Sequence, residues 1–472
     1  MAETYPSETR TKPDRPVATI DVLPDEVLLE VLSYIWKTHW KTFLNLSLTS
    51  RRLNVISEPF LYHTYRYSYR INNLSRNFIL SLVNRPQLAS HLKNIVLEDW
   101  AIRTYPLSRW TGLSGPRSQV SLLSAAEQFQ FPAQLTDKWK DELKDDLDDA
   151  KIALLFLLTP NVEKMNLVVP PCYNPKNCEK QDLWLLRLLH SAVNNDKVTH
   201  LHGFTALRSL QLTGTSTRDG FCLRQFAPLF CSPSLRTFSA TNCLEMGSMS
   251  NWNEIQNTSH IESITFNGSQ LSMDAIKCVL GACKAVKSFD FEWKCINLQA
   301  EEAPLLDYAI LDEALQLHMR SLESLKIRFT ESWRGEMWAV DTGVNSCLHS
   351  LGKFPNLRMV DVASNALLEF DASTQAASQG DLSHLSNLLP PSLEKLVLNY
   401  WESIPPPEYN PRFEHLRYLA AECSLLLPKL KSLEIHTHGE KEQGWEDLAI
   451  QFGNNGVKFS VTGRVYRRQM AG

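Results

Sequence analysis

The chain has 472 residues, of which 43% are apolar, so it has ample apolar side chains for a folded core. Its 48 basic and 52 acidic residues give a formal net charge of −4, a balance that is poorly suited to holding the phosphate backbone of nucleic acid. No segment approaches the roughly 18 apolar residues of a membrane span, and the first residues lack the pattern of a secretory signal. We therefore expect a protein of the cytoplasm, the nucleus or both that binds neither nucleic acid nor membrane.

The first 67 residues divide into a lead-in and a small helical unit. Residues 1–19 are polar and contain three prolines, which predicts a disordered segment. From residue 20, Pro24 and two following acidic residues suit the start of a helix, and apolar residues recur at helical spacing over 27–35 and 43–48. Ser50 is expected to cap a third short helix, which Pro59 should end. Three short helices have only a marginal core, so we expect this unit, residues 20–67, to pack against a partner or against the next domain.

The rest of the chain, residues 68–472, repeats a short strand pattern, L-x-x-L-x-L, in which other apolar residues replace leucine. It occurs at residues 92–97, 162–167, 207–212, 235–240, 261–266, 286–291, 322–327, 357–362, 393–398 and 430–435, with a terminal strand at 456–461. Several intervening segments have helical periodicity, as at 274–280, 311–317 and 416–423. One strand and one helix cannot bury their own apolar faces, so neighbouring units must stack. The pattern predicts an α/β fold, an irregular leucine-rich-repeat solenoid with parallel strands inside and helices outside.

A charged segment at residues 137–149 contains both acidic and basic residues. Leu143, Leu147, Ala150 and Leu154 recur there at helical spacing. This pattern predicts a helix with a solvated charged face, and an acidic docking surface is the alternative.

Side chains between the leucine positions of each repeat strand should line the inner surface of the solenoid, because side chains alternate along a strand. Most of them are small and polar. The candidates for substrate contact are Asp290, Glu292, Trp293, Lys326, Arg328, Tyr400, Trp401 and His436. The aromatic members could anchor a ligand or simply pack in turns, and the charged members could pair with one another.

Motifs for catalysis and cofactor binding are absent from the sequence. It has no glycine-rich phosphate loop, no H-E-x-x-H and no G-x-S-x-G. The ten cysteines are scattered without a C-x-x-C pair and are predicted to be reduced, while Cys172 and Cys178 are a disfavoured metal-binding alternative. We expect no catalytic site, no metal and no cofactor.

The N-terminal unit resembles an F-box. The likeness is carried by residues 23–28 (LPDEVL), 31–35 (VLSYI) and 43–53 (FLNLSLTSRRL), although Leu53 stands where family members usually have tryptophan. Residues 85–92 (RPQLASHL) and 154–163 (LLFLLTPNVE) are similar to the start of the leucine-rich region in many fungal F-box proteins.

This resemblance implies the substrate-recognition subunit of a Skp–cullin–F-box ubiquitin ligase. The F-box would bind a Skp-type adaptor and through it a cullin, and the repeats would bind a protein substrate for ubiquitination and proteasomal degradation. The adaptor contacts carried over by motif position are Leu23, Pro24, Val27, Leu28, Leu44, Leu46, Ser50 and Arg52. The alternatives are a leucine-rich scaffold that works outside any ligase, a three-helix cap that only closes the end of the solenoid, and, ranked last, a hydrolase or other enzyme with its site in the loops.

Overall fold

The computed structural model describes residues 20–36, 39–68, 74–98, 116–129, 133–169, 183–193, 204–215, 220–245, 249–294, 306–329, 347–368, 384–400, 411–438 and 445–464. The chain divides into two compact units, Met1–Thr64 and Tyr65–Gly472. Within the described ranges, no helix combines the length and the apolar character that crossing a membrane requires.

The first unit is a set of short helices. A 3₁₀ turn at Ile20–Val22 precedes α1 (Asp25–Ile35), α2 (Trp40–Thr49) and α3 (Arg51–Leu61). The Ser50 Oγ accepts a hydrogen bond from the Leu53 N–H at 3.1 Å, which confirms the predicted cap of α3. The prediction that Pro59 ends this helix is wrong, because Pro59 lies inside α3. Proline removes only its own N–H, and the Tyr62 N–H still donates to the Glu58 carbonyl at 3.0 Å.

The second unit is built on one 13-stranded sheet. Its strands follow the chain order along the sheet, with β6 pairing only at the end of β7, and the pairings from β2 to β13 are parallel. The strands are β1 (Thr64–Ser68), β2 (Asn94–Glu98), β3 (Lys164–Val169), β4 (Ser209–Gly214), β5 (Thr237–Thr241), β6 (Leu244–Glu245), β7 (Ser263–Leu271), β8 (Ser288–Trp293), β9 (Ser324–Phe329), β10 (Met359–Ala363), β11 (Lys395–Asn399), β12 (Ser432–His438) and β13 (Lys458–Arg464).

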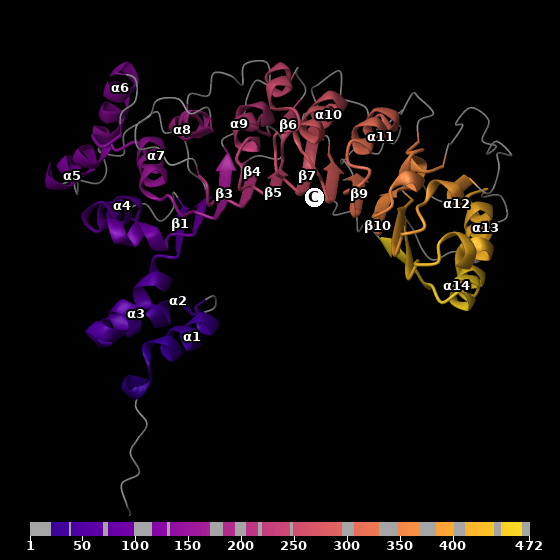
Figure 1. Ribbon diagram of the computed structural model, residues 1–472, viewed down its shortest axis with the longest axis horizontal. Helices are drawn as coiled ribbons and strands as arrows, with labels where there is room; N and C mark the ends of the chain where they lie inside the picture. Colours follow the sequence, from indigo (N-terminus) through magenta and orange to yellow (C-terminus); the bar gives the residue numbers. More distant parts are fainter. Residues whose placement is uncertain are drawn as a thin grey trace, which may run out of the picture. The chain divides into compact units, whose positions relative to one another are not determined.

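Helices cover one side of this row of strands (Figure 1). They are α4 (Leu74–Asn84), α5 (Pro116–Ala126), α6 (Ala133–Lys144), α7 (Asp148–Leu158), α8 (Trp184–Val193), α9 (Ala227–Phe230), α10 (Met273–Ala282), α11 (Tyr308–Gln316), α12 (His384–Leu388), α13 (Pro411–Leu426) and α14 (Trp445–Asn454). The predicted solenoid, with parallel strands on one side and helices on the other, is thereby confirmed.

Each predicted strand exists, but it begins two residues after the first apolar position of the sequence pattern. That first position precedes the strand and is buried all the same, as at Leu207, Leu235 and Ile261. Aromatic side chains then pack edge to face from one repeat to the next, with the Phe266 ring centred 5.9 Å from that of Phe238 and 6.3 Å from that of Phe291. The pattern missed β1 and β6, which lack the leucine spacing.

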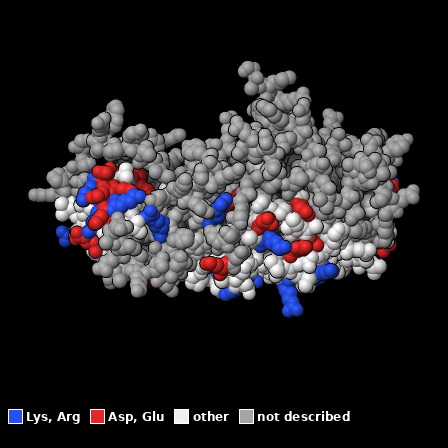
Figure 2. Space-filling view, turned by 90° about the horizontal axis from the view of Figure 1, so that it is seen from above, with Lys and Arg blue, Asp and Glu red and all other residues white. Residues whose placement is uncertain are grey.

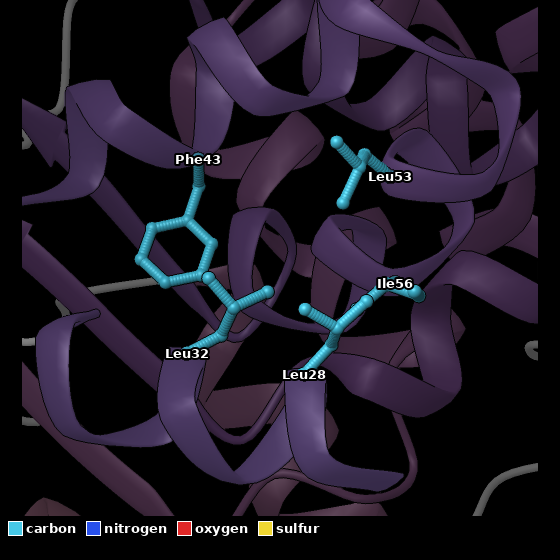
Figure 3. Close-up of a cluster of buried hydrophobic side chains, with 5 residues drawn as sticks. All are labelled: Leu28, Leu32, Phe43, Leu53 and Ile56. Carbon is cyan, nitrogen blue, oxygen red and sulfur yellow. The ribbon is translucent and has the colours of Figure 1, made fainter. Parts of the chain in front are cut away.

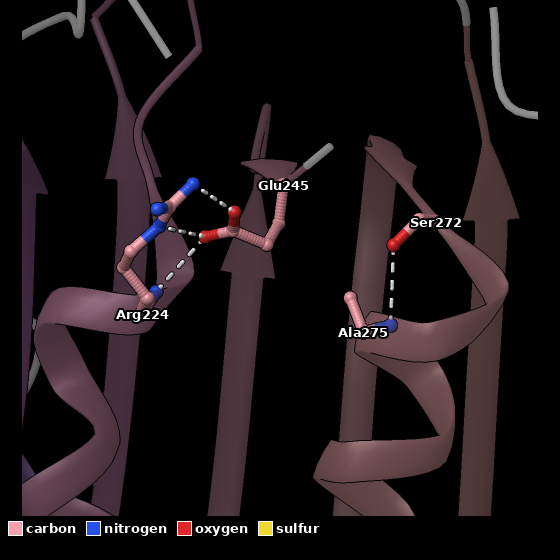
Figure 4. A network of polar contacts seen from close by, with 4 residues as sticks. All are labelled: Arg224, Glu245, Ser272 and Ala275. Carbon is pink, nitrogen blue, oxygen red and sulfur yellow. Dashed lines mark hydrogen bonds and ion pairs between the residues drawn. The ribbon is translucent and has the colours of Figure 1, made fainter. Parts of the chain in front are cut away.

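A buried ion pair ties β6 to the turn before α9 (Figure 4). The Glu245 carboxylate is fully buried and accepts three hydrogen bonds from Arg224: the backbone N–H at 3.1 Å, Nε at 3.3 Å and Nη2 at 2.8 Å. The next repeat begins its helix with a side-chain cap, in which the Ser272 Oγ accepts from the Ala275 N–H at 3.2 Å. These contacts hold the turn that leads into α9 and the first turn of α10.

The charged segment at 137–149 differs from its prediction as one solvated helix face. It spans α6 and the start of α7, and Asp148 and Asp149 are buried. Asp148 accepts a hydrogen bond from the Tyr67 hydroxyl at 2.5 Å and lies 3.0 Å from the Lys151 ammonium, while Asp149 accepts from the Trp184 N–H at 2.7 Å. Paired and hydrogen-bonded charges tolerate burial, so this end of the segment packs in the interior.

Over α6 the charges do remain exposed. Figure 2 shows acidic and basic side chains intermixed at the end of the molecule where α6 lies, and Lys144 pairs with Asp141 at 2.7 Å. Mixed signs do not form the acidic docking surface of the alternative interpretation.

A buried histidine links α10, α11 and the entry to β8. The Val286 N–H donates to His318 Nδ1 at 3.3 Å, so the ring proton sits on Nε2, which donates to the Leu280 carbonyl at 3.0 Å. Burial lowers the pKa of His318, and the hydrogen bond to Leu280 opposes that effect in part. The neutral ring is the form that fits this position.

We expect this histidine to make the sheet unit less stable in acid. Below the ordinary pKa of 6.5, the histidine of the unfolded chain takes up a proton, whereas the folded chain keeps the ring neutral. The contribution of this group to the free energy of unfolding is therefore fully present above pH 6.5 and is lost as the pH falls toward the lowered pKa of the folded chain. The slope from this one group is at most about 1.4 kcal/mol per pH unit. Urea unfolding between neutral and acidic pH should show a shallower pH dependence for His318→Gln than for the wild type. A His39→Gln control, on an exposed ring, should keep the wild-type slope.

Candidate docking surfaces

The interior of the first unit is small. Its buried core is formed by five side chains from α1, α2 and α3, which converge in Figure 3: Leu28, Leu32, Phe43, Leu53 and Ile56. Half-buried side chains such as Leu46 and Phe60 pack around them, and Phe43 and Phe60 lie 5.0 Å apart between ring centres. A core of this size leaves many apolar side chains of the three helices outside.

Apolar exposure is concentrated in this unit. Of the 14 large apolar side chains that are exposed within the described ranges, ten lie between residues 20 and 55. They are Ile20, Val22, Leu23, Val27, Leu29, Val31, Tyr34, Leu44, Leu48 and Val55. The much larger second unit supplies only Val120, Leu317, Leu425 and Ile450. Exposed apolar side chains gathered on a small helical unit are typical of a protein-binding surface.

The eight residues predicted to contact an adaptor occupy two kinds of position. Leu23, Pro24, Val27 and Leu44 are exposed, with the three non-proline side chains between 40% and 44% accessible. Leu28 is buried in the unit's own core and Leu46 packs against that core. Both therefore support the helices that carry the exposed side chains.

The two polar members of that set hold the helices together. Ser50 caps α3, and Arg52 forms an ion pair with Asp25 at 2.6 Å and donates to the Leu23 carbonyl. Arg52 therefore fastens the start of α1 to α3, beside the exposed Leu23. The predicted set left out Val22, Tyr34, Leu48 and Val55, which are more exposed than Leu23, Val27 and Leu44. Leu48 lies in the apolar run 43–48 of the sequence pattern, whereas Val22, Tyr34 and Val55 are not among its apolar positions.

On the inner face of the sheet, the predicted charged residues of β8 and β9 meet. Asp290 lies 2.7 Å from Arg328 and 3.7 Å from Lys326, and the carboxylate of Glu292 accepts a hydrogen bond from the Gly268 N–H at 3.2 Å. The expected pairing within this set is therefore present. The hydrogen bond with Asp290 and the nearby acidic groups outweigh burial and raise the pKa of Arg328.

The aromatic candidates are not exposed. Trp293 and Tyr400 are only 8% and 2% accessible, so the packing interpretation fits both and neither presents a free ring. Trp401 lies outside the described residues. His436 is half-buried, and its Nδ1 lies 3.0 Å from the Asn399 Oδ1, whose amide nitrogen donates to Asp361 at 2.8 Å.

Burial limits how much of the inner face a partner could reach. In β10 and β11 both faces are buried, including Asp361, Val397 and Asn399. From β4 to β9 the inward positions are at least partly accessible. In β4, β5 and β7 these positions are seven hydroxyl and two amide side chains: Ser209, Gln211, Thr213, Thr237, Ser239, Thr241, Ser263, Thr265 and Asn267. The accessible inner surface is therefore uncharged over β4 to β7 and charged over β8 and β9.

Cysteine chemistry departs from the sequence prediction at one position. Cys222 is disulfide-bonded, so the expectation that every cysteine is reduced is wrong there, whereas Cys231, Cys243, Cys278, Cys283, Cys347 and Cys423 are free. Within the described ranges, no group of three or more histidine, cysteine or acidic side chains is arranged to hold a metal ion. Cys172 and Cys178 lie outside those ranges.

Two family models match the chain. An F-box-like domain matches residues 20–68, and a leucine-rich repeat domain matches residues 103–404, more than half of the chain. A search of curated proteins finds no match. The F-box-like match covers the helical unit with the exposed apolar side chains, and the repeat match covers most of the parallel sheet. The chain therefore belongs to the leucine-rich repeat domain family and carries an F-box-like domain ahead of its repeats.

Proposed function

We propose that this protein is the substrate-recognition subunit of a Skp–cullin–F-box ubiquitin ligase. In this proposal the F-box-like unit binds a Skp-type adaptor, and through it a cullin, while the inner face of the repeats binds a protein substrate for ubiquitination and degradation. F-box-like and repeat domains together are typical of receptor proteins, and we propose no catalytic site or cofactor in this chain. The same role places the protein in the cytoplasm or the nucleus.

The observation that carries this proposal is the set of exposed apolar side chains on α1 and α2. An adaptor that covers Leu23, Val27 and Leu44 would remove from water the area that the unit's own five-residue core leaves out. A helix-in-groove contact, with anchors at helical spacing, suits this arrangement.

A charged substitution on that surface should abolish adaptor binding without unfolding the unit. Because Val27 is exposed, Val27→Glu leaves the buried core intact, but it places a carboxylate in the proposed interface. We expect co-purification with a Skp-type adaptor to fall at least about tenfold, equivalent to about 1.4 kcal/mol. Ile450→Glu, which changes an apolar and more exposed site on α14, is the control and should bind normally.

The alternative of a scaffold outside any ligase makes a different prediction. A scaffold would recover neither adaptor nor cullin in the pull-down, and Val27→Glu would then change nothing. Normal adaptor recovery by Val27→Glu and by Leu44→Glu would contradict the assignment of the docking surface.

A further inference from the structure

A row of charged side chains runs along the edge of the sheet where the strands begin. The residue immediately before each strand from β2 to β12, leaving out β6, is charged. In sheet order these residues are Lys93, Glu163, Arg208, Arg236, Glu262, Lys287, Glu323, Arg358, Glu394 and Lys431. We refer to this set as the charged ladder.

The backbone holds the charged ladder in register. From Glu163 onward, the N–H of each member donates to the carbonyl of the member on the preceding strand, at 2.7 to 2.9 Å. Adjacent strands lie about 4.8 Å apart, so consecutive side chains of the ladder are direct neighbours. Opposite charges in such positions stabilise a sheet, and like charges destabilise it.

The sign of the charge alternates along the ladder except at one step. Lys93 pairs with Glu163 at 3.1 Å, Glu262 pairs with Lys287 at 2.8 Å, and Glu394 pairs with Lys431. The exception is Arg208 followed by Arg236, where the Arg236 N–H donates to the Arg208 carbonyl at 2.9 Å. Two cations are thus direct neighbours at this step, with no carboxylate between them.

The surroundings of this step add positive charge. Lys284 is exposed and its ammonium lies 3.0 Å from His260 Nε2. Burial lowers the pKa of His260, and the charges of Lys284 and Arg236 lower it further. Arg236 donates from Nη1 to the carbonyls of Pro233 and Leu235, at 2.8 and 3.0 Å, and Arg208 is exposed and makes no ion pair with a described residue. The nearest acidic members of the ladder are already in ion pairs with cations on the strands further away: Glu163 with Lys93, and Glu262 with Lys287.

We propose that the step between Arg208 and Arg236 is a docking position for an aspartate or glutamate side chain of a partner protein. One added carboxylate would make the sign alternate without interruption from Lys93 to Lys431. Arginine binds carboxylates through charge-assisted hydrogen bonds, and no described residue forms an ion pair with the exposed Arg208. This proposal concerns the edge of the sheet and does not depend on adaptor binding by the F-box-like unit.

A carboxylate fits this step better than a phosphate because of the charge already in place. Each other junction of the ladder sets one cation against one carboxylate, so a single negative charge completes the pattern. A phosphate group would bring close to two negative charges at neutral pH, more than the single charge that the pattern lacks.

The experiment measures binding of a synthetic glycine–serine peptide that carries a run of glutamates, with acetylated and amidated ends, to the full-length chain at low ionic strength. We expect Arg208→Ser/Arg236→Ser to weaken binding about fivefold or more, because both charge-assisted contacts are lost. Lys287→Ser/Lys431→Ser is the matched control, since it removes the same charge from ladder positions that already face a glutamate. It should change binding by less than about twofold. Added salt should weaken the wild-type interaction.

Arg208→Ser alone provides a second variant, because Arg208 is exposed and removing it leaves the carbonyl contacts of Arg236 in place. We expect this single variant also to bind the glutamate peptide more weakly. Equal losses in the two double variants would show only general attraction to a charged edge and would overturn the proposal. Tighter binding of the phosphoserine counterpart than of the glutamate peptide would overturn the choice of a carboxylate.

Discussion

Replacing Glu245 by alanine is expected to destabilise the sheet unit by about 3–5 kcal/mol. The carboxylate is fully buried and accepts from the backbone N–H and two guanidinium nitrogens of Arg224, so its removal takes a bonded counter-charge away from a mostly buried cation. Urea unfolding of the full-length chain, followed by circular dichroism, measures the change in the free energy of unfolding.

Two comparisons separate this effect from a general loss of charge. Glu313 pairs with Lys277 at 3.0 Å on the surface, where both side chains are more than half exposed, so Glu313→Ala should cost less than about 1 kcal/mol. Removing both charges with Arg224→Met/Glu245→Leu should recover much of the stability lost in Glu245→Ala, since no uncompensated charge remains. A cost below about 1 kcal/mol for Glu245→Ala would show that the pair is dispensable.

The second large effect is expected from Phe43→Ala in the first unit. Truncating a buried aromatic side chain typically costs about 3–5 kcal/mol. A single small core rarely supplies more than about 3–5 kcal/mol in total. Because Phe43 is one of five core side chains, its loss should unfold α1, α2 and α3 within the full-length chain.

Hydrogen exchange by residue is the measurement suited to this prediction. Amides of the three helices should lose protection in Phe43→Ala, while those of β7, β8 and β9 keep it, because they belong to the other compact unit. Tyr34→Ala, which truncates an exposed ring in the same unit, should leave protection unchanged. Retained protection of α1 to α3 in Phe43→Ala would contradict the view that this core is minimal.

The repeat architecture could be predicted because its signal is local and periodic. The apolar residues that begin each pattern, as at Leu207, Leu235 and Ile261, are buried. Their regular spacing predicts buried positions from the local sequence alone, without knowledge of distant contacts. The cap at Ser50 was predictable for the same reason, since it depends only on the residue three positions later.

Features that depend on distant neighbours could not be predicted. Asp148 is buried because Tyr67, 81 residues earlier, donates a hydrogen bond to it, and a charge run alone favours a solvated face. Trp293 is the last residue of β8 and Tyr400 directly follows β11; a ring at a strand end can point either way, and only the packed structure shows both in the interior. The residues of the charged ladder are plain in the sequence, but only the strand register shows that they are direct neighbours.

The sheet has two open ends, because its strand order runs from β1 to β13 without returning to the start. No pairing between the first and last strands fixes the curvature, so a small change of tilt at each junction adds to the next along the row. The curvature of such a stack can therefore change through small rotations that are spread over many neighbouring repeats. Under the proposed function, such a row could accommodate protein substrates of different widths with the same set of side chains.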